Sequence, residues 1–290
     1  MELQPRYSVV ILTWNSRQHI GPCLESLAQA ANGDPAELIV IDNGSRDGTP
    51  QMVRSLVPDA RLICNRENRG VAAARNQGLV LARAPVSIIL DVDTVVMPGA
   101  FTRLLDFLET APSVGVCGPR LTLPDGSTQP SCQLFPTVLD KIARQLPPPL
   151  ARSWLAEVEL AQWDHLGVRD IDYVVGACQA IRMSALRTVG WLDERIFYGP
   201  EDVDLCLRMR FLGWRVTYLG DAVVRHECQR VTRHRLNALT LRHALGLAHL
   251  FRTHGYLWSR TGLYRRIAEA QASRRDPALG RGEPCEAVLG

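Results

Sequence analysis

The feature that most constrains this fold is residues 86–94 (VSIILDVDT), an apolar run that ends abruptly at Asp91 and Asp93. A short unbroken apolar run predicts a strand buried on both faces, as in parallel sheets covered by helices. Ligands of open α/β sheets bind beyond the carboxyl ends of such strands. In extended chain the two carboxylates would point to the same side, where they suit Mg²⁺ or Mn²⁺ on a diphosphate. A strand followed by a ligand-free, Asp-rich turn is the alternative.

Composition limits the class of protein. With 290 residues, 46% hydrophobic and 22% charged, the chain is long enough for one large α/β domain plus an appendage. A net charge of +3 is too small to indicate nucleic acid as a partner, but it leaves an anionic ligand or lipid surface open. No apolar run reaches the roughly 18–20 residues of a membrane span, and no signal peptide is recognisable. Eight cysteines without C-x-x-C pairs indicate reduced, mostly buried thiols in a cytoplasmic protein.

Three strand–loop–helix steps precede the acidic strand, and polar residues follow each strand. The predicted strands span residues 7–13, 37–41 and 61–65, and the helices residues 20–31, 51–56 and 72–82. The absence of G-x-G-x-x-G after the first strand argues against NAD and FAD. Asp42, at the tip of the second strand, could accept hydrogen bonds from a ribose or a base. Residues 42–49 could equally be only a capped turn, with Asp47 or Thr49 as N-cap, and Arg75 only a solvated helix charge.

The second half carries another acidic cluster. After a predicted helix at residues 98–110 and an irregular, proline-rich segment at 131–149, Pro200 precedes Glu201, Asp202 and Asp204. Carboxylates in the first turn of a helix complement its dipole, which is their simplest interpretation. His226 near a strand end would ordinarily be structural. Residues 235–259 predict a basic amphipathic helix, which either lies on anionic lipid or packs on its own domain or a second subunit.

Several motifs, taken in order, resemble the nucleotide half of glycosyltransferase family 2, the inverting enzymes of GT-A fold. They are T-W-N at residues 13–15, I-D-N-G-S-x-D-G-T at 41–49, N-R-G at 68–70, A-R-N-x-G at 74–78 and L-D-V-D at 90–93. The resemblance implies a Rossmann-like α/β fold, with a mixed sheet flanked by helices and a helical C-terminal extension. It also implies nucleotide-sugar contacts from Thr13, Asn15, Asp42, Asn43, Ser45, Asp47, Asn68, Gly70, Arg75, Asn76, Asp91, Val92 and Asp93.

The second cluster extends this resemblance. P-E-D-V-D-L-C-L-R at residues 200–208 is similar to the family's E-D-x-D-L-x-x-R motif, whose second acidic residue is the catalytic base. This implies Asp202 as the base, with Glu201 beside it, and His226 as a third metal ligand after Asp93 and Asp91. The implied acceptor side consists of Gly176, Ala177, Cys178 and Trp191. Residues 228–232 depart from relatives that transfer rhamnose, which continue with a glycine and a serine. The departure leaves the loop that covers the diphosphate open, and Arg230 or Arg233 could supply a positive charge there instead.

The resemblance implies metal-dependent, inverting transfer of a sugar from a nucleotide diphosphate to an acceptor hydroxyl. A carboxylate that takes the hydroxyl proton and a Mn²⁺ or Mg²⁺ ion on the diphosphate suffice for this chemistry. The expected donor is dTDP-rhamnose, followed by a UDP-hexose. The acceptor would be a glycan, a lipid-linked sugar or a small molecule in bacterial polysaccharide or glycoconjugate synthesis, at the inner face of the plasma membrane or free in the cytoplasm.

Two other functions stay open from the sequence. A sugar nucleotidyltransferase shares the fold class and an Asp-held metal, although it should carry a Gly- and Arg-rich loop where T-W-N-S stands at residues 13–16. A degenerate, non-catalytic nucleotide-sugar-binding subunit is the second. The predicted domains are a catalytic domain (1–230, with nucleotide half 1–97 and acceptor half 98–230), a helical extension (231–270) and a disordered tail (271–290). A homodimer is compatible with this organisation.

Overall fold

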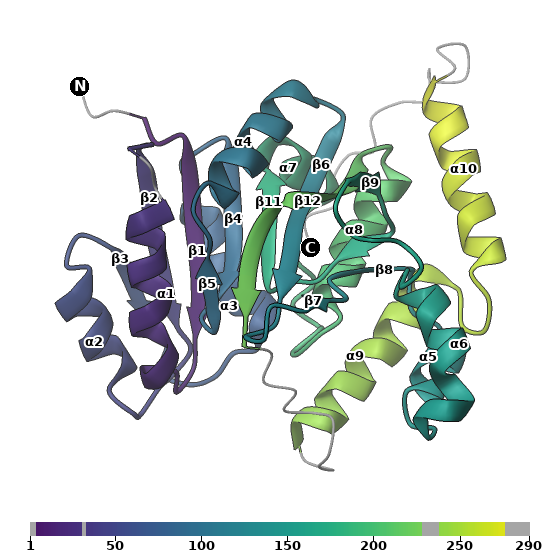
Figure 1. Ribbon diagram of the computed structural model, residues 1–290, viewed down its shortest axis with the longest axis horizontal. Helices are drawn as coiled ribbons and strands as arrows, with labels where there is room; N and C mark the ends of the chain where they lie inside the picture. The colour runs from purple at the N-terminus through teal and green to yellow at the C-terminus, as the bar shows by residue number, and fades with distance from the viewer. Residues whose placement is uncertain (1–3, 31–32, 228–237, 276–290) are drawn as a thin grey trace, which may run out of the picture.

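The computed structural model describes residues 4–30, 33–227 and 238–275, in which a central sheet lies between two layers of helices (Figure 1). Its strands are hydrogen-bonded in the order β3-β2-β1-β4-β11-β6-β12-β5, with β7 added to β6 and β9 to β12, while β8 and β10 pair separately. The strands are β1 (Tyr7–Thr13), β2 (Ala36–Asp42), β3 (Arg61–Cys64), β4 (Val86–Asp91), β5 (Thr94–Val96), β6 (Val114–Thr122), β7 (Thr128–Gln129), β8 (Cys132–Gln133), β9 (Val168–Asp170), β10 (Tyr173–Val174), β11 (Cys178–Arg182) and β12 (Arg215–His226).

The sheet is mixed, as predicted. β1 pairs in parallel with β2 and β4, whereas β11 runs antiparallel to both β4 and β6. Because of this reversal, the carboxyl end of β4 meets the amino end of β11 at one edge of the sheet. There the amide of Asp91 donates a hydrogen bond of 2.8 Å to the carbonyl of Ala177. Residues far apart in sequence thus reach one place.

Helices cover both faces of the sheet because side chains alternate along its strands. Val9, Ile11, Ile88 and Leu90 belong to one buried cluster with α1, α2 and α4; Val10 and Ile89 belong to the other, with α3, α7 and α8. The helices are α1 (Arg17–Ala30), α2 (Thr49–Leu56), α3 (Val71–Leu81), α4 (Ala100–Thr110), α5 (Val138–Ala143), α6 (Pro148–Val158), α7 (Met183–Val189), α8 (Glu201–Phe211), α9 (Ala238–His254) and α10 (Thr261–Arg275).

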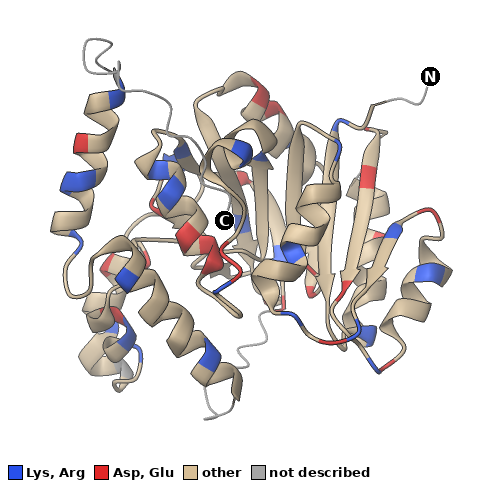
Figure 2. Cartoon of the chain, turned by 180° about the vertical axis from the view of Figure 1, so that it is seen from behind, with Lys and Arg blue, Asp and Glu red and all other residues tan. Residues whose placement is uncertain are grey.

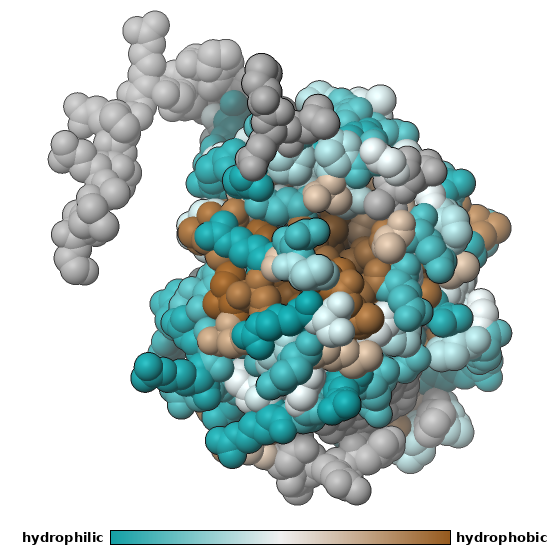
Figure 3. All heavy atoms as spheres, turned by 90° about the vertical axis from the view of Figure 1, so that its left-hand side faces the viewer, coloured by the Kyte–Doolittle hydropathy of each residue, from teal (hydrophilic) through white to brown (hydrophobic). Residues whose placement is uncertain are grey.

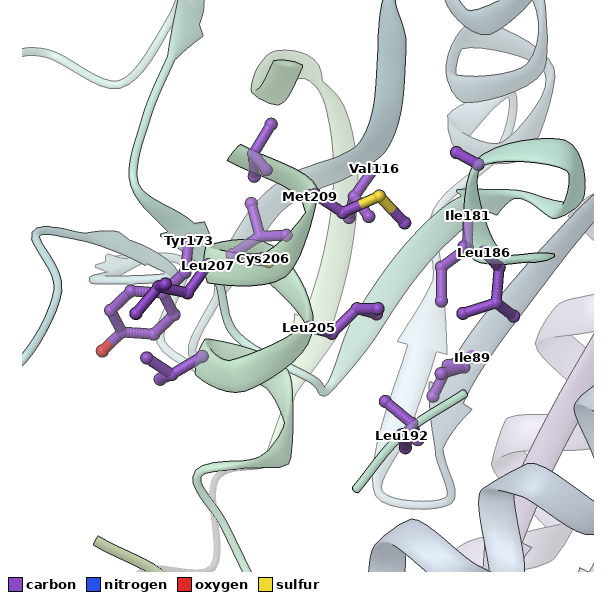
Figure 4. Packing of buried hydrophobic residues seen from close by; sticks show 14 of the residues in the cluster. Ile89, Val116, Tyr173, Ile181, Leu186, Leu192, Leu205, Cys206, Leu207 and Met209 are labelled. Carbon is purple, nitrogen blue, oxygen red and sulfur yellow. The ribbon is translucent and has the colours of Figure 1, made fainter. Parts of the chain in front are cut away.

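The second of these clusters anchors α8, the helix that begins with the acidic motif. Met209 of α8 lies beside Val116 of β6, and Leu186 of α7 beside Ile181 of β11 (Figure 4). This packing fixes the axis of α8 and so the position of its first turn. At the opposite end of the sheet, the central residues of the edge strand β3 are only partly buried. The face of the molecule at this end shows a band of hydrophobic residues between hydrophilic ones (Figure 3).

The C-terminal helices pack on the helices that cover the central sheet. Leu250 and Phe251 of α9, and Leu263 and Ile267 of α10, share the cluster that contains α8. Of the alternatives left open for residues 235–259, the structure shows packing on the chain's own core for Leu250 and Phe251 of α9. None of the described helices is long and apolar enough to cross a bilayer. Helix α10 extends to Arg275, so the prediction of a disordered tail from residue 271 is wrong for residues 271–275. The rest of that tail, the domain boundary at 230 and residues 228–232 lie outside the described residues.

Three local predictions need correction. The acidic strand ends at Asp91, and a turn leads into the separate strand β5, so the two aspartates are not joined by extended chain. Within the predicted irregular segment, residues 131–149, α5 forms because Thr137 and Asp140 make a reciprocal capping box. Cys64 is exposed, although the cysteines described at 23, 117, 132, 178 and 206 are free and buried, as expected.

Candidate active site

Asp91, Asp93 and His226 form a candidate metal centre. One ligand atom from each residue lies within 4.8 Å of the others. The tight turn after β4 brings the two aspartates together, and the antiparallel pairing of β12 with β5 places His226 opposite Thr94. Two carboxylates and one imidazole are donors that suit Mn²⁺ and are compatible with Mg²⁺. The residues present therefore fit the divalent ion that the sequence predicts.

His226 is held in the orientation that a metal ligand needs. Its Nδ1 donates to Oε1 of Gln129 at 2.9 Å, and its Nε2 lies 3.3 Å from Oδ1 of Asp93. Burial alone would lower the pKa of His226, but the hydrogen bond to Asp93 and the nearby carboxylates raise it overall. A partner that fixes the distal ring nitrogen is a usual feature of metal-binding histidines. The sequence did not point to Gln129, because nothing in its local pattern links it to a strand ninety-seven residues away.

Arg75 connects the candidate metal centre with the start of α8. Only 3% of this residue is exposed. Its guanidinium donates to Oδ1 of Asp91 at 2.6 Å, to Oε1 of Glu201 at 2.9 Å and to the carbonyl of Gly176 at 2.8 Å. Arg75 is thus no solvated helix charge. Its planar fork holds two carboxylates and a loop in fixed relation.

Acidic residues open α8, where the chain is coloured red in Figure 2, and the first two of them differ in environment. Glu201 is buried beside Arg75; burial raises its pKa, while the Arg75 charge opposes that rise. Asp202 is more exposed, and its Oδ2 accepts a 2.9 Å hydrogen bond from the amide of Gly176. Of the two, Asp202 has the better access to a ligand. Glu201 acts on the site chiefly through Arg75.

A single cleft of about 490 Å³ brings these groups together. Of the predicted site residues, the structure places in its lining Asn15, Arg75, Asp91, Val92, Asp93, Gly176, Ala177, Glu201, Asp202 and His226. Asp93 and Asp202 thus lie in the same cleft, as one bound donor would require. The sequence missed other lining residues, among them Lys141, Tyr173, Tyr198 and His243.

A second group of predicted residues shapes the loops that adjoin the cleft but does not line it. The Asp42 carboxylate accepts from Thr13 Oγ1 at 3.0 Å and from the Ser45 amide at 2.9 Å. Asp47 accepts from the amides of Arg17 and Thr49, the first residues of α1 and α2. The N-cap of α2 is Gly48, so the prediction of Asp47 or Thr49 as N-cap is wrong. These carboxylates therefore tie the loops after β1 and β2 to each other and to the starts of α1 and α2.

Four more predicted residues have the same supporting role. Asn43 donates to Asn68 Oδ1 at 3.0 Å, and Asn68 Oδ1 also accepts from the amide of Gly70 at 2.9 Å. Asn76 is engaged by the backbone of Leu192, both as donor and as acceptor. Asn76 thus braces the loop before α8 and does not face the cleft.

Two residues predicted for the acceptor side, Cys178 and Trp191, are not among those that line the cleft. Cys178 is buried in β11, where it pairs with Leu90 of β4. Trp191 is 38% exposed, and its carbonyl accepts from Arg208. The small-residue segment at Gly176 and Ala177 does line the cleft. A Cβ atom on Gly176 would lie 2.8 Å from Arg75 Nη1, which explains the need for glycine there.

Comparison with known proteins identifies the family of this chain. The sequence profile of Glycosyl transferase family 2 matches residues 8–190. The N-acetylglucosaminyl-diphospho-decaprenol L-rhamnosyltransferase of Mycobacterium tuberculosis is 30% identical over 232 residues, which cover 76% of this chain and 75% of that protein. The pre-mycofactocin glycosyltransferase of the same organism is 30% identical over 195 residues, 66% of this chain and 37% of the relative.

Solved structures show the same fold. A mannosyltransferase from Pyrobaculum calidifontis, solved with GDP-Man and Mn²⁺, aligns with a TM-score of 0.62 at 22% identity, over 96% of this chain and 73% of the other. GalNAc-T7, solved with UDP, GalNAc and Mn²⁺, aligns with a TM-score of 0.61 at 15% identity, over 96% of this chain and 59% of the other. The chain therefore belongs to glycosyltransferase family 2 and is a transferase enzyme of GT-A fold.

Proposed function

We propose that this enzyme transfers rhamnose from dTDP-rhamnose, with inversion at the anomeric carbon, to a hydroxyl of a lipid-linked sugar acceptor; a UDP-hexose is the second choice of donor. The observation that carries the proposal is the shared cleft, in which Asp202 and the Asp91–Asp93–His226 group both face one ligand-sized space. The transferred sugar and the class of acceptor follow those named for the mycobacterial rhamnosyltransferase, of which this chain covers three quarters.

In the proposed reaction, Asp202 accepts the proton of the attacking acceptor hydroxyl. General-base catalysis of this kind contributes on the order of 10²- to 10⁴-fold in rate. Asp91, Asp93 and His226 would hold the divalent ion, which when bound supplies charge stabilisation to the departing diphosphate. Arg75 holds Asp91, a candidate metal ligand, at a fixed distance from the start of α8, which carries Asp202. The metal centre and the proposed base thus keep a fixed relative position.

A contact with the membrane surface belongs to the same proposal. Leu241 and Leu245 of α9 are 63% and 61% exposed, on a helix that also carries Arg242 and Arg252. Exposed apolar side chains flanked by arginines suit the interface of an anionic bilayer. Such a contact would bring the enzyme to an acceptor embedded in that bilayer. Sedimentation with anionic and with neutral vesicles would test it, and equal recovery in both supernatants would contradict it.

The function is tested by incubating the purified chain with dTDP-rhamnose, UDP-glucose, UDP-N-acetylglucosamine or GDP-mannose and a short-chain lipid-diphosphate N-acetylglucosamine. Each donor is supplied with Mn²⁺, with Mg²⁺ and with EDTA. We expect a glycosylated product with dTDP-rhamnose, no product in EDTA, and an anomeric configuration by NMR opposite to that of the donor. Retention of configuration or full turnover in EDTA would refute the proposed mechanism.

A further inference from the structure

Lys141 is the single lysine in the sequence, and it lies in the lining of the active-site cleft. The nearby charges that act on its ammonium are those of Asp202, Asp140 and Arg144, and its own charge acts on His243. These residues place Lys141 at the Asp202 end of the cleft. In the proposed function this is the acceptor side. The metal-dependent reaction as described above has no role for a cation at this end.

The carboxylate next to Lys141 in sequence is already engaged. Asp140 is 1% exposed and accepts from the Thr137 amide and from Trp154 Nε1, each at 2.7 Å, and from Arg260. Three donors therefore satisfy Asp140 without help from Lys141. Likewise, the Arg144 guanidinium, whose charge acts on Lys141, is already paired, because it lies 2.5 Å from the Glu159 carboxylate.

Across the described residues, no group accepts a hydrogen bond from the Lys141 ammonium or forms an ion pair with it. Burial lowers the pKa of Lys141 to about 8, with a smaller contribution from the charge of Arg144. Its ammonium is thus partly removed from water without a compensating anion. An arriving anionic ligand would provide that compensation, since partly buried charges gain most from a direct partner.

The backbone around Lys141 is firmly held. The capping box of Thr137 and Asp140 closes the first turn of α5, and the Val138 amide donates to the carbonyl of Leu257 at 3.0 Å. Arg260 adds a bond to the carbonyl of Phe135. The segment that follows α9 therefore clamps α5 against the domain. A preorganised cation of this kind binds an anion at lower entropic cost than one on a free loop.

Exposed hydrophobic residues occur on α5, the helix that carries Lys141, and on α6. The two helices contact each other, as Figure 1 also shows. Their exposed hydrophobic residues, and those of the turn between them, are Leu139 (38%), Ile142 (49%), Leu146 (45%), Leu150 (71%) and Trp154 (44%). Exposed apolar side chains on two helices in contact are typical of a binding site. A cation in the cleft, on a helix that also exposes apolar side chains, fits a ligand that is anionic at one end and apolar beyond it.

We propose that Lys141 binds the diphosphate of a lipid-linked acceptor, and that the apolar side chains of α5 and α6 receive the first part of its hydrocarbon chain. The inference rests on the proposed function, in which the accepting hydroxyl meets Asp202. In a lipid-diphosphate sugar, only the sugar ring separates that hydroxyl from the diphosphate. A cation at the Asp202 end of the same cleft is therefore suitably placed. Lys141 is an acceptor-binding residue and takes no part in proton transfer.

The test compares two acceptors that differ only in the anionic group: a short-chain prenyl diphosphate N-acetylglucosamine and a neutral alkyl N-acetylglucosaminide of equal chain length. For Lys141→Met we expect KM for the diphosphate acceptor to rise about tenfold, the worth of one charge-assisted contact. The kinetics with the neutral glycoside and the KM for the donor should stay unchanged. Lys141→Arg should recover most of the affinity. Arg152→Met, which removes an exposed charge from α6, is the matched control and should resemble the wild type.

A binding measurement separates this inference from the proposed function. Calorimetric titration with the prenyl diphosphate N-acetylglucosamine, without donor and metal, should give binding to the wild type and about tenfold weaker binding to Lys141→Met. This result would support the inference even if no sugar were transferred. Equal affinity of wild type and variant, or an equal loss with the neutral glycoside, would overturn it. A variant impaired only in binding free dTDP or UDP would place Lys141 on the donor and also overturn it.

Discussion

The amide of Gly176 donates a 2.9 Å hydrogen bond to Oδ2 of Asp202. The other oxygen of Asp202 accepts from the amide of Val203 at 2.8 Å, so both ends of the carboxylate are oriented by backbone. Two such bonds fix the rotamer of a proposed base while leaving further lone pairs for a substrate hydroxyl. The loop before β11 and the first turn of α8 thus form one rigid unit around the reacting position.

The first prediction concerns Asp202→Asn. The amide side chain keeps the shape but loses the capacity to take a proton, so kcat should fall about 10²- to 10⁴-fold. Donor and Mn²⁺ binding, measured by calorimetry, should stay within a factor of two or so of the wild type, because Asp202 is not among the candidate metal ligands. Near-normal transfer by this variant would remove Asp202 from the mechanism.

Gly176→Ala tests the close approach of Arg75. The new Cβ would lie 2.8 Å from Arg75 Nη1, so the guanidinium must shift away from Asp91 and Glu201. We expect kcat/KM to fall by about tenfold or more, because an Å-scale misplacement weakens positioning. Gly167→Ala is the control, since nothing lies within 4 Å of the Cβ it would add. Equal activity of the two variants would show that the contact is unimportant.

Gln129→Ala should weaken metal binding without removing a metal ligand. Loss of the partner that orients His226 typically costs about 10- to 100-fold in affinity. Titration with Mn²⁺, followed by electron paramagnetic resonance, should show this weakening, whereas Asp93→Asn should abolish metal-dependent nucleotide binding. If Gln129→Ala binds Mn²⁺ as tightly as the wild type does, the hydrogen bond to Nδ1 has no orienting role.

Asp204→Asn tests how α8 is joined to α9. The buried Asp204 carboxylate pairs with Arg208 at 2.8 Å and with His254 at 2.7 Å. Breaking a buried pair costs on the order of 3 kcal/mol, so the free energy of unfolding should fall by about that amount near neutral pH. Asp59→Asn, at an exposed position, is the control and should change stability little.

The effect of Asp204→Asn should depend on pH. Burial by itself would raise the pKa of Asp204, but the hydrogen bond to His254 and the Arg208 charge lower it below 3.8. A carboxylate with a depressed folded pKa stabilises the protein above its unfolded pKa, and this contribution fades as the pH falls through the folded value. Urea denaturation should thus show a wild-type advantage at pH 6 that shrinks at and below about pH 3.8. A constant difference across this range would contradict the assignment.

The sequence by itself determined the first four strands of the sheet, the helices between them and the family. The apolar run before Asp91 and the strands near it are local patterns, and their alternation is enough to predict two covered faces. The resemblance of motifs such as that at Glu201 and Asp202 pointed to an inverting transferase. Local pattern also identified residues 42–49 as a polar loop that leads into a helix, because such signals involve only neighbouring residues.

Only the tertiary structure decided which polar residues meet. Arg75 reaches Glu201 across 126 positions of sequence, and His226 reaches Gln129 across 97, distances over which no local pattern carries information. The same is true of Lys141, whose single charge carried no local signal; the long-range contacts that hold α5, such as the bond from the Val138 amide to the carbonyl of Leu257, place it in the cleft. Periodicity determines which face of a helix or strand is buried, whereas long-range packing determines which residues that face contacts.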